Sequence, residues 1–526
     1  MHIIVADDLP ASARALLEAE GWTVDARAGR PVEQLAADLV DADALVVRSA
    51  TRVTPVLIAA APRLRAIARA GTGVDNVDVA AASARGIVVM NAPGANSISV
   101  AELAMAQLLA LARKLPAADA SMKAGRWDKK AFLGEEVRGK VLGLAGFGRI
   151  GQEVARRARA FGMTILAHDP FIARTVADEW GVELVSLDEL VGRADYVSLH
   201  MPSTPETRRI FGADLFARCK RGLRIINTAR GDLIDEPALV AALQSGQVGG
   251  AALDVFTSEP TTDHTLQQLP QVVASPHIAA STREGQELVG VETATALRDF
   301  LKTGVIRNAV NFPTVPPEEY QRLQPYLRLA ERLGFILGHL GSARIEGVGV
   351  RYYGELASGP NPLLVSAVLV GLFRAILQDT VTPVNARSIA HDRGIDVIES
   401  VSSRPRPLRA VLSVKLKTDA GDRWIEGTSV NRQARICLLD GVEIEAPAEG
   451  TLLVIGNHDQ PGVIGEVGTI LGRHDINIAN FALGRGEHGA VGIVSVDNHD
   501  GRLDETVLRE IRAAKAVKTA SLVGEA

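Results

Sequence analysis

The sequence predicts an α/β protein with two Rossmann-like, doubly wound parallel-sheet domains, followed by an α+β domain and a smaller α+β module. Short apolar runs alternate with segments of helical period as far as about residue 300. The glycine pattern Gly146-x-Gly148-x-x-Gly151 lies between one such run and one such helix. At 526 residues the chain is also long enough for three or four domains of ordinary size.

The first domain is expected to contain four strands, at residues 3–6, 44–47, 64–68 and 87–90. Arg48 follows the second of these strands and Arg69 follows the third. Ligands of open α/β sheets bind beyond the carboxyl ends of the strands, so both arginines are placed to bind an anionic substrate. The alternative is that they are ordinary surface arginines at the start of loops.

The glycine pattern joins an expected strand at residues 141–145 to an expected helix at residues 150–161. In this pattern Gly146 makes the tight turn, Gly148 lets a pyrophosphate approach the backbone, and Gly151 lets helix and strand pack closely. The unpaired N–H groups at the start of the helix favour a phosphate at the same place. These features together predict a dinucleotide site.

Asp169 identifies the dinucleotide. It ends the next expected strand, residues 164–168, and stands 18 residues after Gly151. A carboxylate at this point can accept both hydroxyls of an adenosine ribose, whereas a 2'-phosphate would meet a like charge. We therefore predict that the cofactor is NAD.

Before the glycine pattern, Ser99-x-x-Glu102 has the form of a capping box and predicts a helix as far as Arg113. Its many leucines predict burial on most sides. The basic segment at residues 121–130, which contains Trp127, is expected to be a solvated loop or, alternatively, an arm that reaches a neighbouring subunit's anion site.

Four further strands are expected after Asp169, at residues 196–200, 224–227, 251–255 and 272–274. The segments that follow them should converge on the crevice that holds the nicotinamide. A helix at residues 282–300 and an extended segment at residues 307–311 then return to the first domain. We therefore expect a substrate-binding domain formed by residues 1–96 and 283–312, with an NAD-binding domain, residues 97–282, inserted in it.

The C-terminal part begins after a proline-rich linker at residues 312–317. Residues 318–447 are expected to form a domain of mixed helices and strands, with a helix at 327–340 and a strand at 408–415. They contain no motif that indicates catalysis or ligand binding. From residue 450 to residue 526, the order strand, glycine loop, helix and strand predicts a small regulatory α+β module.

Charge and composition exclude several classes of protein. The 57 Lys and Arg against 62 Asp and Glu give a net charge of -5, and no basic tail indicates a nucleic-acid partner. No apolar stretch approaches membrane length, and the N-terminus does not have the pattern of a signal segment. Cys219 and Cys437 cannot supply a disulfide framework or a zinc quartet, so we expect a cytoplasmic protein without a metal site.

Moving a hydride between NAD and a 2-hydroxy acid requires a proton acceptor and a cation for the carboxylate. His277 follows an expected strand and has the only side-chain type whose ordinary pKa lies near neutrality. Glu259 is placed to bond its far ring nitrogen, and Arg230 to bind a carboxylate through two parallel N–H bonds. Taken singly, each residue has a structural explanation, but together they follow successive strands beyond a dinucleotide pattern.

Four longer motifs support this interpretation: Gly146-Phe-Gly-Arg-Ile-Gly, Asn227-Thr-Ala-Arg-Gly, Gly250-Ala-Ala-Leu-Asp-Val-Phe-Thr-Ser-Glu-Pro260 and Ser275-Pro-His-Ile-Ala-Ala280. With them the chain resembles the D-isomer-specific 2-hydroxyacid dehydrogenases. The segments Val47-Arg-Ser-Ala-Thr51 and Arg69-Ala-Gly-Thr-Gly-Val-Asp-Asn-Val-Asp78 narrow the resemblance to the long-form D-3-phosphoglycerate dehydrogenases. That subfamily has an intervening domain followed by a C-terminal ACT domain of ferredoxin-like fold.

The resemblance implies a set of site residues. The catalytic residues would be Arg230, Glu259 and His277, with His277 as acid and base. NAD would contact Thr72, Gly146, Gly148, Arg149, Ile150, Gly151, Asp169, Met201, Thr228, Ala229, Arg230, Asp254, His277, Ile278, Ala279 and Ala280. The substrate would contact Arg48, Thr51, Arg69, Arg230 and His277.

The resemblance also implies an effector site in the ACT domain. Relatives inhibited by serine bind it between paired ACT domains, at positions that match Asn457, Asp459, Gly462 and Asn477. Asn457 departs from the His or Tyr of the feedback-sensitive relatives. An ACT domain that serves only oligomerisation is the alternative, because fold does not imply function.

The predicted activity is NAD-dependent oxidation of D-3-phosphoglycerate to 3-phosphohydroxypyruvate, the entry to L-serine synthesis, by a homo-oligomer, either a dimer or a homotetramer. A dehydrogenase for another D-2-hydroxy acid, such as 2-hydroxyglutarate, is the nearest alternative, because two arginines do not distinguish phosphate from a second carboxylate. An NAD-sensing binding protein is a more distant alternative. Retention of the three catalytic residues disfavours it.

Overall fold

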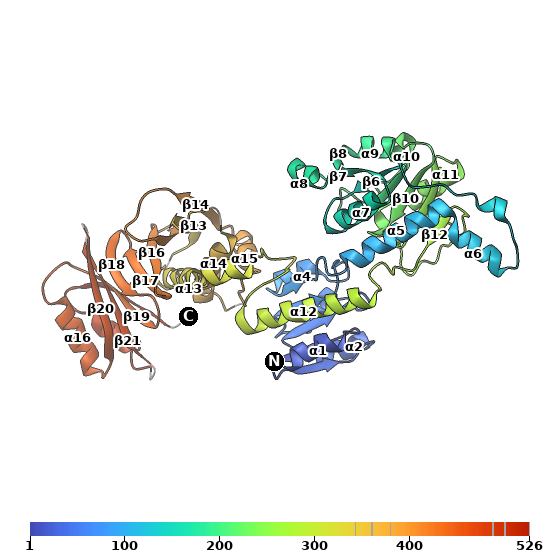
Figure 1. The fold of residues 1–526 in the computed structure, drawn as a ribbon. Helices are drawn as coiled ribbons and strands as arrows, with labels where there is room; N and C mark the ends of the chain where they lie inside the picture. The colour runs from blue at the N-terminus through green and yellow to red at the C-terminus, as the bar shows by residue number, and fades with distance from the viewer. Residues whose placement is uncertain (342, 359–360, 379, 487–488, 499–500, 525–526) are drawn as a thin grey trace.

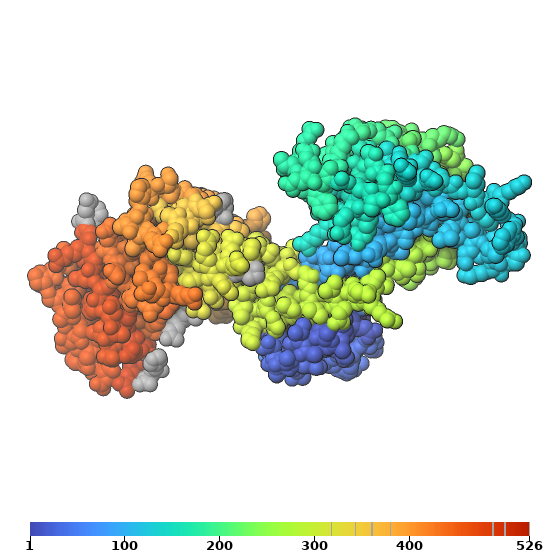
Figure 2. All heavy atoms as spheres, viewed as in Figure 1, coloured from blue at the N-terminus to red at the C-terminus, as the bar shows by residue number. Residues whose placement is uncertain are grey.

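The computed structural model describes residues 1–341, 343–358, 361–378, 380–486, 489–498 and 501–524. Figure 1 shows two α/β units built from the N-terminal part of the chain, with the long helix α12 (Arg283–Thr303) running along one of them. The C-terminal part, drawn in yellow to red in Figure 2, forms a separate mass at one end of the molecule.

The first unit is a parallel five-stranded sheet with the order β2-β1-β3-β4-β5. Its strands are β1 (His2–Val5), β2 (Thr23–Ala26), β3 (Ala44–Val47), β4 (Ala66–Arg69) and β5 (Val88–Met90). Its helices are α1 (Ala11–Glu18), α2 (Val32–Asp38), α3 (Pro55–Ala59), α4 (Val79–Ala84) and α12. All of β3 is buried, as a central strand of a parallel sheet requires. The apolar pattern does not predict β2, because this edge strand is partly exposed and contains Asp25.

The second unit is a parallel seven-stranded sheet with the order β12-β11-β10-β9-β6-β7-β8. Its strands are β6 (Val141–Ala145), β7 (Thr164–His168), β8 (Glu183–Leu184), β9 (Tyr196–Leu199), β10 (Leu223–Asn227), β11 (Val248–Leu253) and β12 (Val272–Ala274). Its helices are α7 (Arg149–Ala160), α8 (Arg174–Glu179), α9 (Leu187–Arg193), α10 (Ala213–Arg218) and α11 (Glu236–Gln244), with a short η2 (Gly231–Leu233). The strand order reverses at β6, which places the ligand crevice beside the loop that follows it.

The chain crosses between the two units twice. The first crossing leads into α5 (Ser97–Arg113), and the second leads into α12, which is capped by Thr282. The predicted capping box is wrong: α5 begins at Ser97, after Asn96, and Ser99 already lies inside its first turn. Ser99 Oγ instead lies 2.7 Å from Thr282 Oγ1, so it joins the two crossings, while Glu102 pairs with Arg157 of α7.

The segment after α5 is more ordered than a solvated loop. It forms α6 (Leu115–Lys123) and a short η1 (Lys129–Phe132), and the hydroxyl of Ser121 is buried and bonded to Asp128. Trp127 and Leu133 nevertheless remain about four-fifths exposed, at 80% and 81%. Figure 1 shows this segment projecting from the far end of the second unit.

The third unit begins with α13 (Pro317–Leu340), which starts ten residues before the helix expected from the sequence. Proline is tolerated in the first turn of a helix, but Pro325 in its interior hides the helical pattern. The helix packs with α14 (Pro362–Ile376) and α15 (Ala386–Asp392) on a mixed sheet of order β14-β13-β15-β16-β17-β18. Its strands are β13 (Ile345–Gly354), β14 (Asp396–Ser402), β15 (Ala410–Thr418), β16 (Arg423–Val430), β17 (Gln433–Leu439) and β18 (Val442–Pro447).

The fourth unit is an antiparallel sheet of order β20-β21-β19-β22. It consists of β19 (Thr451–Asn457), α16 (Val463–Arg473), β20 (Asn477–Gly486), β21 (Gly489–Asp497), α17 (Glu505–Arg512) and β22 (Val517–Val523). Side chains such as Leu453 and Val494 face the two helices, whereas Leu452 and Ile493 join the core of the third unit. The predicted fold class is confirmed. Among the described residues, no helix is both long and apolar enough to cross a membrane.

Candidate active site

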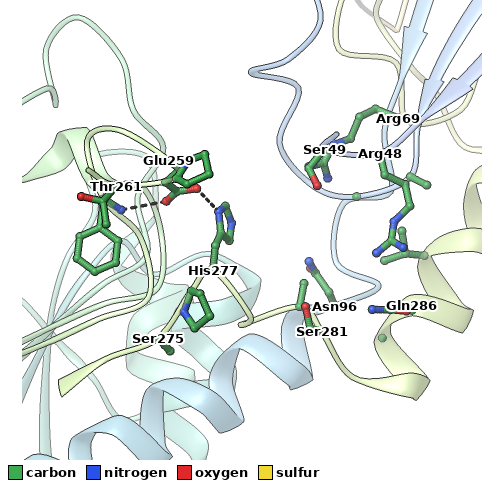
Figure 3. A pocket seen from close by; sticks show the side chains of 18 of the residues that line it. Arg48, Ser49, Arg69, Asn96, Glu259, Thr261, Ser275, His277, Ser281 and Gln286 are labelled. Carbon is green, nitrogen blue, oxygen red and sulfur yellow. Dashed lines mark hydrogen bonds and ion pairs between the residues drawn. The ribbon is translucent and has the colours of Figure 1, made fainter. Parts of the chain in front are cut away.

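A pocket of about 720 Å³ lies between the two parallel sheets, where the loops that follow their strands face one another. Figure 3 shows His277 and Glu259 on one wall and Arg48 and Arg69 on the opposite wall. The first pair comes from the seven-stranded sheet and the second from the five-stranded sheet. Asn96, at the first crossing, lies between them. The pocket therefore requires both sheets.

His277 and Glu259 form a hydrogen-bonded pair. His277 follows β12 with a left-handed backbone, φ 53°, a conformation that is uncommon outside glycine and clusters at functional sites. Its Nδ1 lies 2.6 Å from Glu259 Oε2. The other carboxylate oxygen, Oε1, accepts a 2.9 Å bond from the backbone N–H of Phe256. Glu259 is thus held at both oxygens and fixes the orientation of the imidazole.

The same contact sets the charges of the pair. The bond to Glu259 raises the pKa of His277 above its ordinary value, against the opposing effect of burial. Burial disfavours ionised Glu259, but the His277 ring and the Phe256 N–H together hold the pKa of Glu259 below its ordinary value. The carboxylate therefore stays ionised near neutral pH. Because the bond uses Nδ1, Nε2 of His277 is left to exchange a proton with a substrate.

Asp254 organises the loop that carries His277. It is completely buried at the end of β11. Its carboxylate accepts bonds from Ser275 Oγ at 2.6 Å, Ile278 N at 2.9 Å and Ala279 N at 2.8 Å. Both oxygens are therefore used within the protein, and in this structure the residue supports the loop that carries His277.

The opposite wall of the pocket concentrates positive charge. Burial, together with the neighbouring charge of Arg230, lowers the pKa of Arg69 to about 10, and Arg48 acts in the same direction. Neither Arg48 nor Arg69 forms an ion pair with a described carboxylate. Gly71 makes room for this arrangement, since a Cβ there would lie 1.4 Å from Arg69 Nη1. Asp75 and Asp7 oppose this shift without forming an ion pair with Arg69, so the wall remains suited to bind an anion.

Asp7, which the sequence does not single out, holds the Arg48 loop in place. This buried carboxylate follows β1 and accepts the backbone N–H of Arg48 at 2.6 Å. It also accepts the Thr51 hydroxyl at 2.6 Å. Thr51, expected to contact the substrate, does not line the pocket, whereas Ser49 does. Asp7 and the loop that it bonds are far apart in the sequence, so no local motif predicts this role.

Arg230 lies near the His277–Glu259 pair but points across the cleft. Its positive charge acts to lower the pKa of both Glu259 and His277. Its Nε donates to Asp75 Oδ2 at 3.0 Å, and Asp75 belongs to the loop after β4. Asn227 supports the arginine loop by donating to the Arg230 carbonyl at 2.8 Å. Asp75 thus pairs with the guanidinium that is expected to bind the substrate. The sequence does not reveal this pair, because its two residues come from different sheets.

The three fingerprint glycines have different surroundings. Gly146 has φ 100°, and a Cβ on it would lie 2.6 Å from the backbone of His200. A Cβ on Gly151 would lie 2.4 Å from the carbonyl oxygen of Gly146. Around Gly148, in contrast, a Cβ would meet nothing within 4 Å. Gly146 and Gly151 are therefore required by the fold, whereas Gly148 leaves open the space that a pyrophosphate needs.

Further residues around this loop fit a bound dinucleotide. Asp169 stands at the end of β7 and accepts backbone N–H bonds from Phe147 at 2.8 Å and Phe171 at 2.9 Å. Among the described residues, Thr228 Oγ1 and His200 Nδ1 are buried without a hydrogen-bond partner. Such atoms need a partner that the protein alone does not provide.

The remaining expected cofactor residues lie along the same edge. Thr72 donates to Asn96 Oδ1 at 2.9 Å, and Arg149 donates to the Pro93 carbonyl. Ile150 lies in the first turn of α7, Met201 follows β9, Ala229 follows β10, and Ala280 lines the pocket.

The expected effector residues are not brought together within one chain. Asn457 is buried at the end of β19 with both amide atoms unpartnered, and Asp459 pairs with Arg485 at 3.3 Å. Gly462 precedes α16 with φ 99°. Asn477 begins β20. On the intervening strand β21, Asn457 pairs with Ala490 and Asn477 with Asp497. Seven residues of extended chain separate these partners by about 24 Å.

Three family models match successive parts of the chain. Residues 105–279 match the NAD-binding domain of D-isomer specific 2-hydroxyacid dehydrogenases. Residues 322–439 match the D-3-phosphoglycerate dehydrogenase intervening domain, and residues 451–516 match the ACT domain.

Relatives match nearly the whole chain. The D-3-phosphoglycerate dehydrogenase of Methanocaldococcus jannaschii is 43% identical over 524 residues, 99% of each chain. The enzyme of the same name from Mycobacterium tuberculosis is 40% identical over 519 residues, 98% of this chain and 96% of that one. Among solved structures, a glyoxylate reductase from Paecilomyes thermophila is 33% identical with a TM-score of 0.55, covering 61% of this chain and 99% of that one.

Proposed function

Because the chain belongs to the D-3-phosphoglycerate dehydrogenase family, we propose that the pocket between its parallel sheets oxidises D-3-phosphoglycerate to 3-phosphohydroxypyruvate with NAD, the first step of phosphorylated L-serine synthesis. One observation supports this most strongly: across the pocket, the His277–Glu259 pair faces Arg48 and Arg69, which form no ion pair with a described carboxylate. A proton acceptor and an anion site then lie on opposite sides of the reacting carbon.

His277 acts on the hydroxyl of the substrate. When bound, NAD supplies the carbon that accepts the hydride and its electron pair. Nε2 of His277 takes the hydroxyl proton as the carbonyl forms, and it returns that proton in the reverse direction. Glu259 keeps the ring in the required tautomer through Nδ1 and stabilises the imidazolium that results.

The arginines orient the substrate. Arg230 binds the carboxylate beside the reacting carbon once Asp75 releases it, and it does so through parallel N–H bonds. Arg48 and Arg69 bind the phosphate at the far end. Gly148, the start of α7 and Asp169 bind the pyrophosphate and ribose of the cofactor.

Measuring NADH formation tests this function directly. Purified protein is given NAD and either D-3-phosphoglycerate or D-2-hydroxyglutarate at alkaline pH, with a reagent that traps the ketone. Preference for the phosphorylated acid is the expected result. Turnover of the dicarboxylate alone would retain the catalytic residues but contradict the substrate, and no turnover of either acid would contradict the enzyme function itself.

The proposal extends to assembly and location. We propose a cytoplasmic homotetramer, supported by the exposed apolar side chains of Trp127 and Leu133, which a second copy would cover. Both cysteines are free thiols, as a reducing compartment favours. Sedimentation velocity of wild-type protein and of a Trp127→Ser, Leu133→Ser variant tests the contact. Dissociation of the variant is expected, and an unchanged tetramer would contradict it.

Serine regulation would likewise need two copies. Asn457, Asp459 and Gly462 lie at one end of the ACT sheet and Asn477 at the other, so a site that contains all four requires residues from two chains. The buried, unpartnered amide of Asn457 supports a ligand at the first end. We expect L-serine to inhibit the wild-type enzyme and not an Asp459→Asn variant. Equal inhibition of both proteins would contradict this site.

A further inference from the structure

A second pocket, of about 700 Å³, lies where the six-stranded sheet meets the ACT sheet. Arg435 of β17 and Pro447 at the end of β18 form one side. Ser495 and Asp497 of β21 form the other side, and Glu449 lies in the short link between the two sheets. All of these residues come from one chain, and none belongs to the site between the parallel sheets.

Opposite charges line this pocket without neutralising each other. The Arg435 guanidinium donates to the neutral amide of Gln433 at 3.3 Å. Within the described part of the chain it forms no ion pair, and Glu449 forms none either. Among the described residues, the Asp497 carboxylate receives only a bond from the neutral Asn477 amide, at 2.9 Å. One cation and two carboxylates therefore remain available around a common space.

Ser495 supplies a second, independent observation. It is 8% exposed, and its hydroxyl has no hydrogen-bond partner in the described structure. Side chains alternate along a strand, so Ser495 shares a sheet face with Ile493, which packs into the core of the six-stranded unit. The hydroxyl is therefore directed toward the junction. A buried hydroxyl without a partner needs a water molecule or a ligand.

We propose that this pocket binds a free α-amino acid. Arg435 would bind the carboxylate, Glu449 and Asp497 would bind the ammonium group, and the Ser495 hydroxyl would complete the polar contacts. A simple anion such as phosphate would be repelled by the two carboxylates. A simple cation or a metal ion would be repelled by Arg435. Only a ligand with both charges satisfies every group.

A ligand here would act on the connection between the two sheets. The guanidinium of Arg332, which is 5% exposed on α13, donates to the carbonyls of Ala448 at 2.5 Å and of Gly524 at 2.7 Å, and also to that of Gly450. Glu449 lies between two of these carbonyls. A bound ammonium group that pairs with Glu449 would therefore also restrict the motion of residues 448–450, whose first and last carbonyls Arg332 bonds. The junction between the ACT sheet and α13 would become more rigid.

Isothermal titration calorimetry of the full chain tests the proposal, in an Asp459→Asn background that removes the separate serine site. The probes are L-alanine, ethylamine, propionate and inorganic phosphate. L-alanine is expected to bind, and the three single-charge probes are not. Arg435→Gln and Glu449→Gln should each weaken L-alanine binding about tenfold or more, the loss of one charge-assisted contact. Arg432→Gln and Glu445→Gln, exposed residues outside the pocket, are the matched controls.

Hydrogen exchange provides a second measurement. L-alanine should slow amide exchange at residues 448–452 in the parent protein and not in Arg435→Gln. Absence of L-alanine binding, equal binding of phosphate or propionate, or binding unaffected by either pocket variant would each overturn the proposal. These results are independent of turnover, so they do not depend on the dehydrogenase reaction.

Discussion

The five-stranded and seven-stranded sheets follow the same construction rule but offer a ligand different kinds of contact. Both are parallel, and both present the carboxyl ends of their strands to the same pocket. In the seven-stranded sheet the backbone around Gly146 and Gly148 shapes a place for phosphate. In the five-stranded sheet the Arg48 and Arg69 side chains supply the charge. The comparison teaches that the carboxyl ends of the strands determine where a ligand can lie, while the residues of the following loops determine which chemical groups contact it.

The largest effect is expected on the side of the seven-stranded sheet. His277→Ala should lower kcat for NADH formation by about 10²–10⁴-fold, the usual contribution of a positioned acid or base. NAD affinity, measured by quenching of protein fluorescence, should change little. His264→Ala, an exposed histidine outside the pocket, should keep normal turnover. Full activity of the His277 variant would remove the proposed role of this residue.

A smaller effect is expected across the pocket. Arg69→Gln should lower kcat/KM for D-3-phosphoglycerate by about 10–100-fold, the value of one or two lost charge-assisted bonds. The KM for NAD should remain the same, because this sheet holds the other ligand. Arg52→Gln, a neighbouring exposed arginine, is the control. If Arg69→Gln instead raised the KM for NAD, the proposal that the five-stranded sheet binds the substrate and the seven-stranded sheet binds NAD would be wrong.

Gly146 and Gly148 lie in the same loop and allow a comparison of a glycine needed for folding with one needed for NAD binding. Gly148→Ala has room for its methyl group and should fold normally, while the KM for NAD rises about tenfold. Gly146→Ala must adopt φ 100° and would contact the His200 backbone, so its melting temperature should fall. Thermal unfolding and NAD titration of both variants separate the two roles. Equal melting temperatures would show that the turn does not require glycine.

The pH dependence of the reaction tests the His277–Glu259 pair. Oxidation needs neutral His277, so its rate should rise with pH through a pKa above the ordinary value for histidine, while reduction needs the protonated ring and should fall over the same range. Glu259→Gln removes the main cause of the raised pKa, and the oxidation profile should move about one pH unit toward acid. An unmoved profile would assign the titration to another group.

The smallest effect is expected from Asp75. Since its carboxylate occupies Arg230 before the substrate arrives, Asp75→Asn should lower the KM for D-3-phosphoglycerate by about threefold and leave kcat nearly unchanged, as an exposed ion pair is worth less than about 1 kcal/mol. A raised KM would show instead that Asp75 positions the arginine for binding.

The sequence predicts the central strands better than the edges. The bounds of β3, β6 and β7 coincide with apolar runs, because strands buried on both faces leave that signal. β12 is an exception, since it is an edge strand whose bounds are predicted because its three residues, Val-Val-Ala, are all apolar. β2 and β8 lie at sheet edges, where polar residues are tolerated and the signal disappears. Ser99 shows a different failure. Its local pattern fits a cap, but its hydroxyl bonds Thr282 from a distant crossing.

In the candidate site, local motifs single out His277, Glu259 and the glycines. Asp7 and Asp75 escape notice, because each acts on a loop that only the folded sheets bring near. The separation of Asn457 from Asn477 is likewise a property of strand register.

The bond between Ser99 and Thr282 has a mechanical consequence. The two crossings of the chain between the sheets are joined by this bond beside the pocket. Any relative motion of the two sheets that pulls the crossings apart must therefore break it. Asn96, which lines the pocket at the first crossing, is held near the second crossing in the same way.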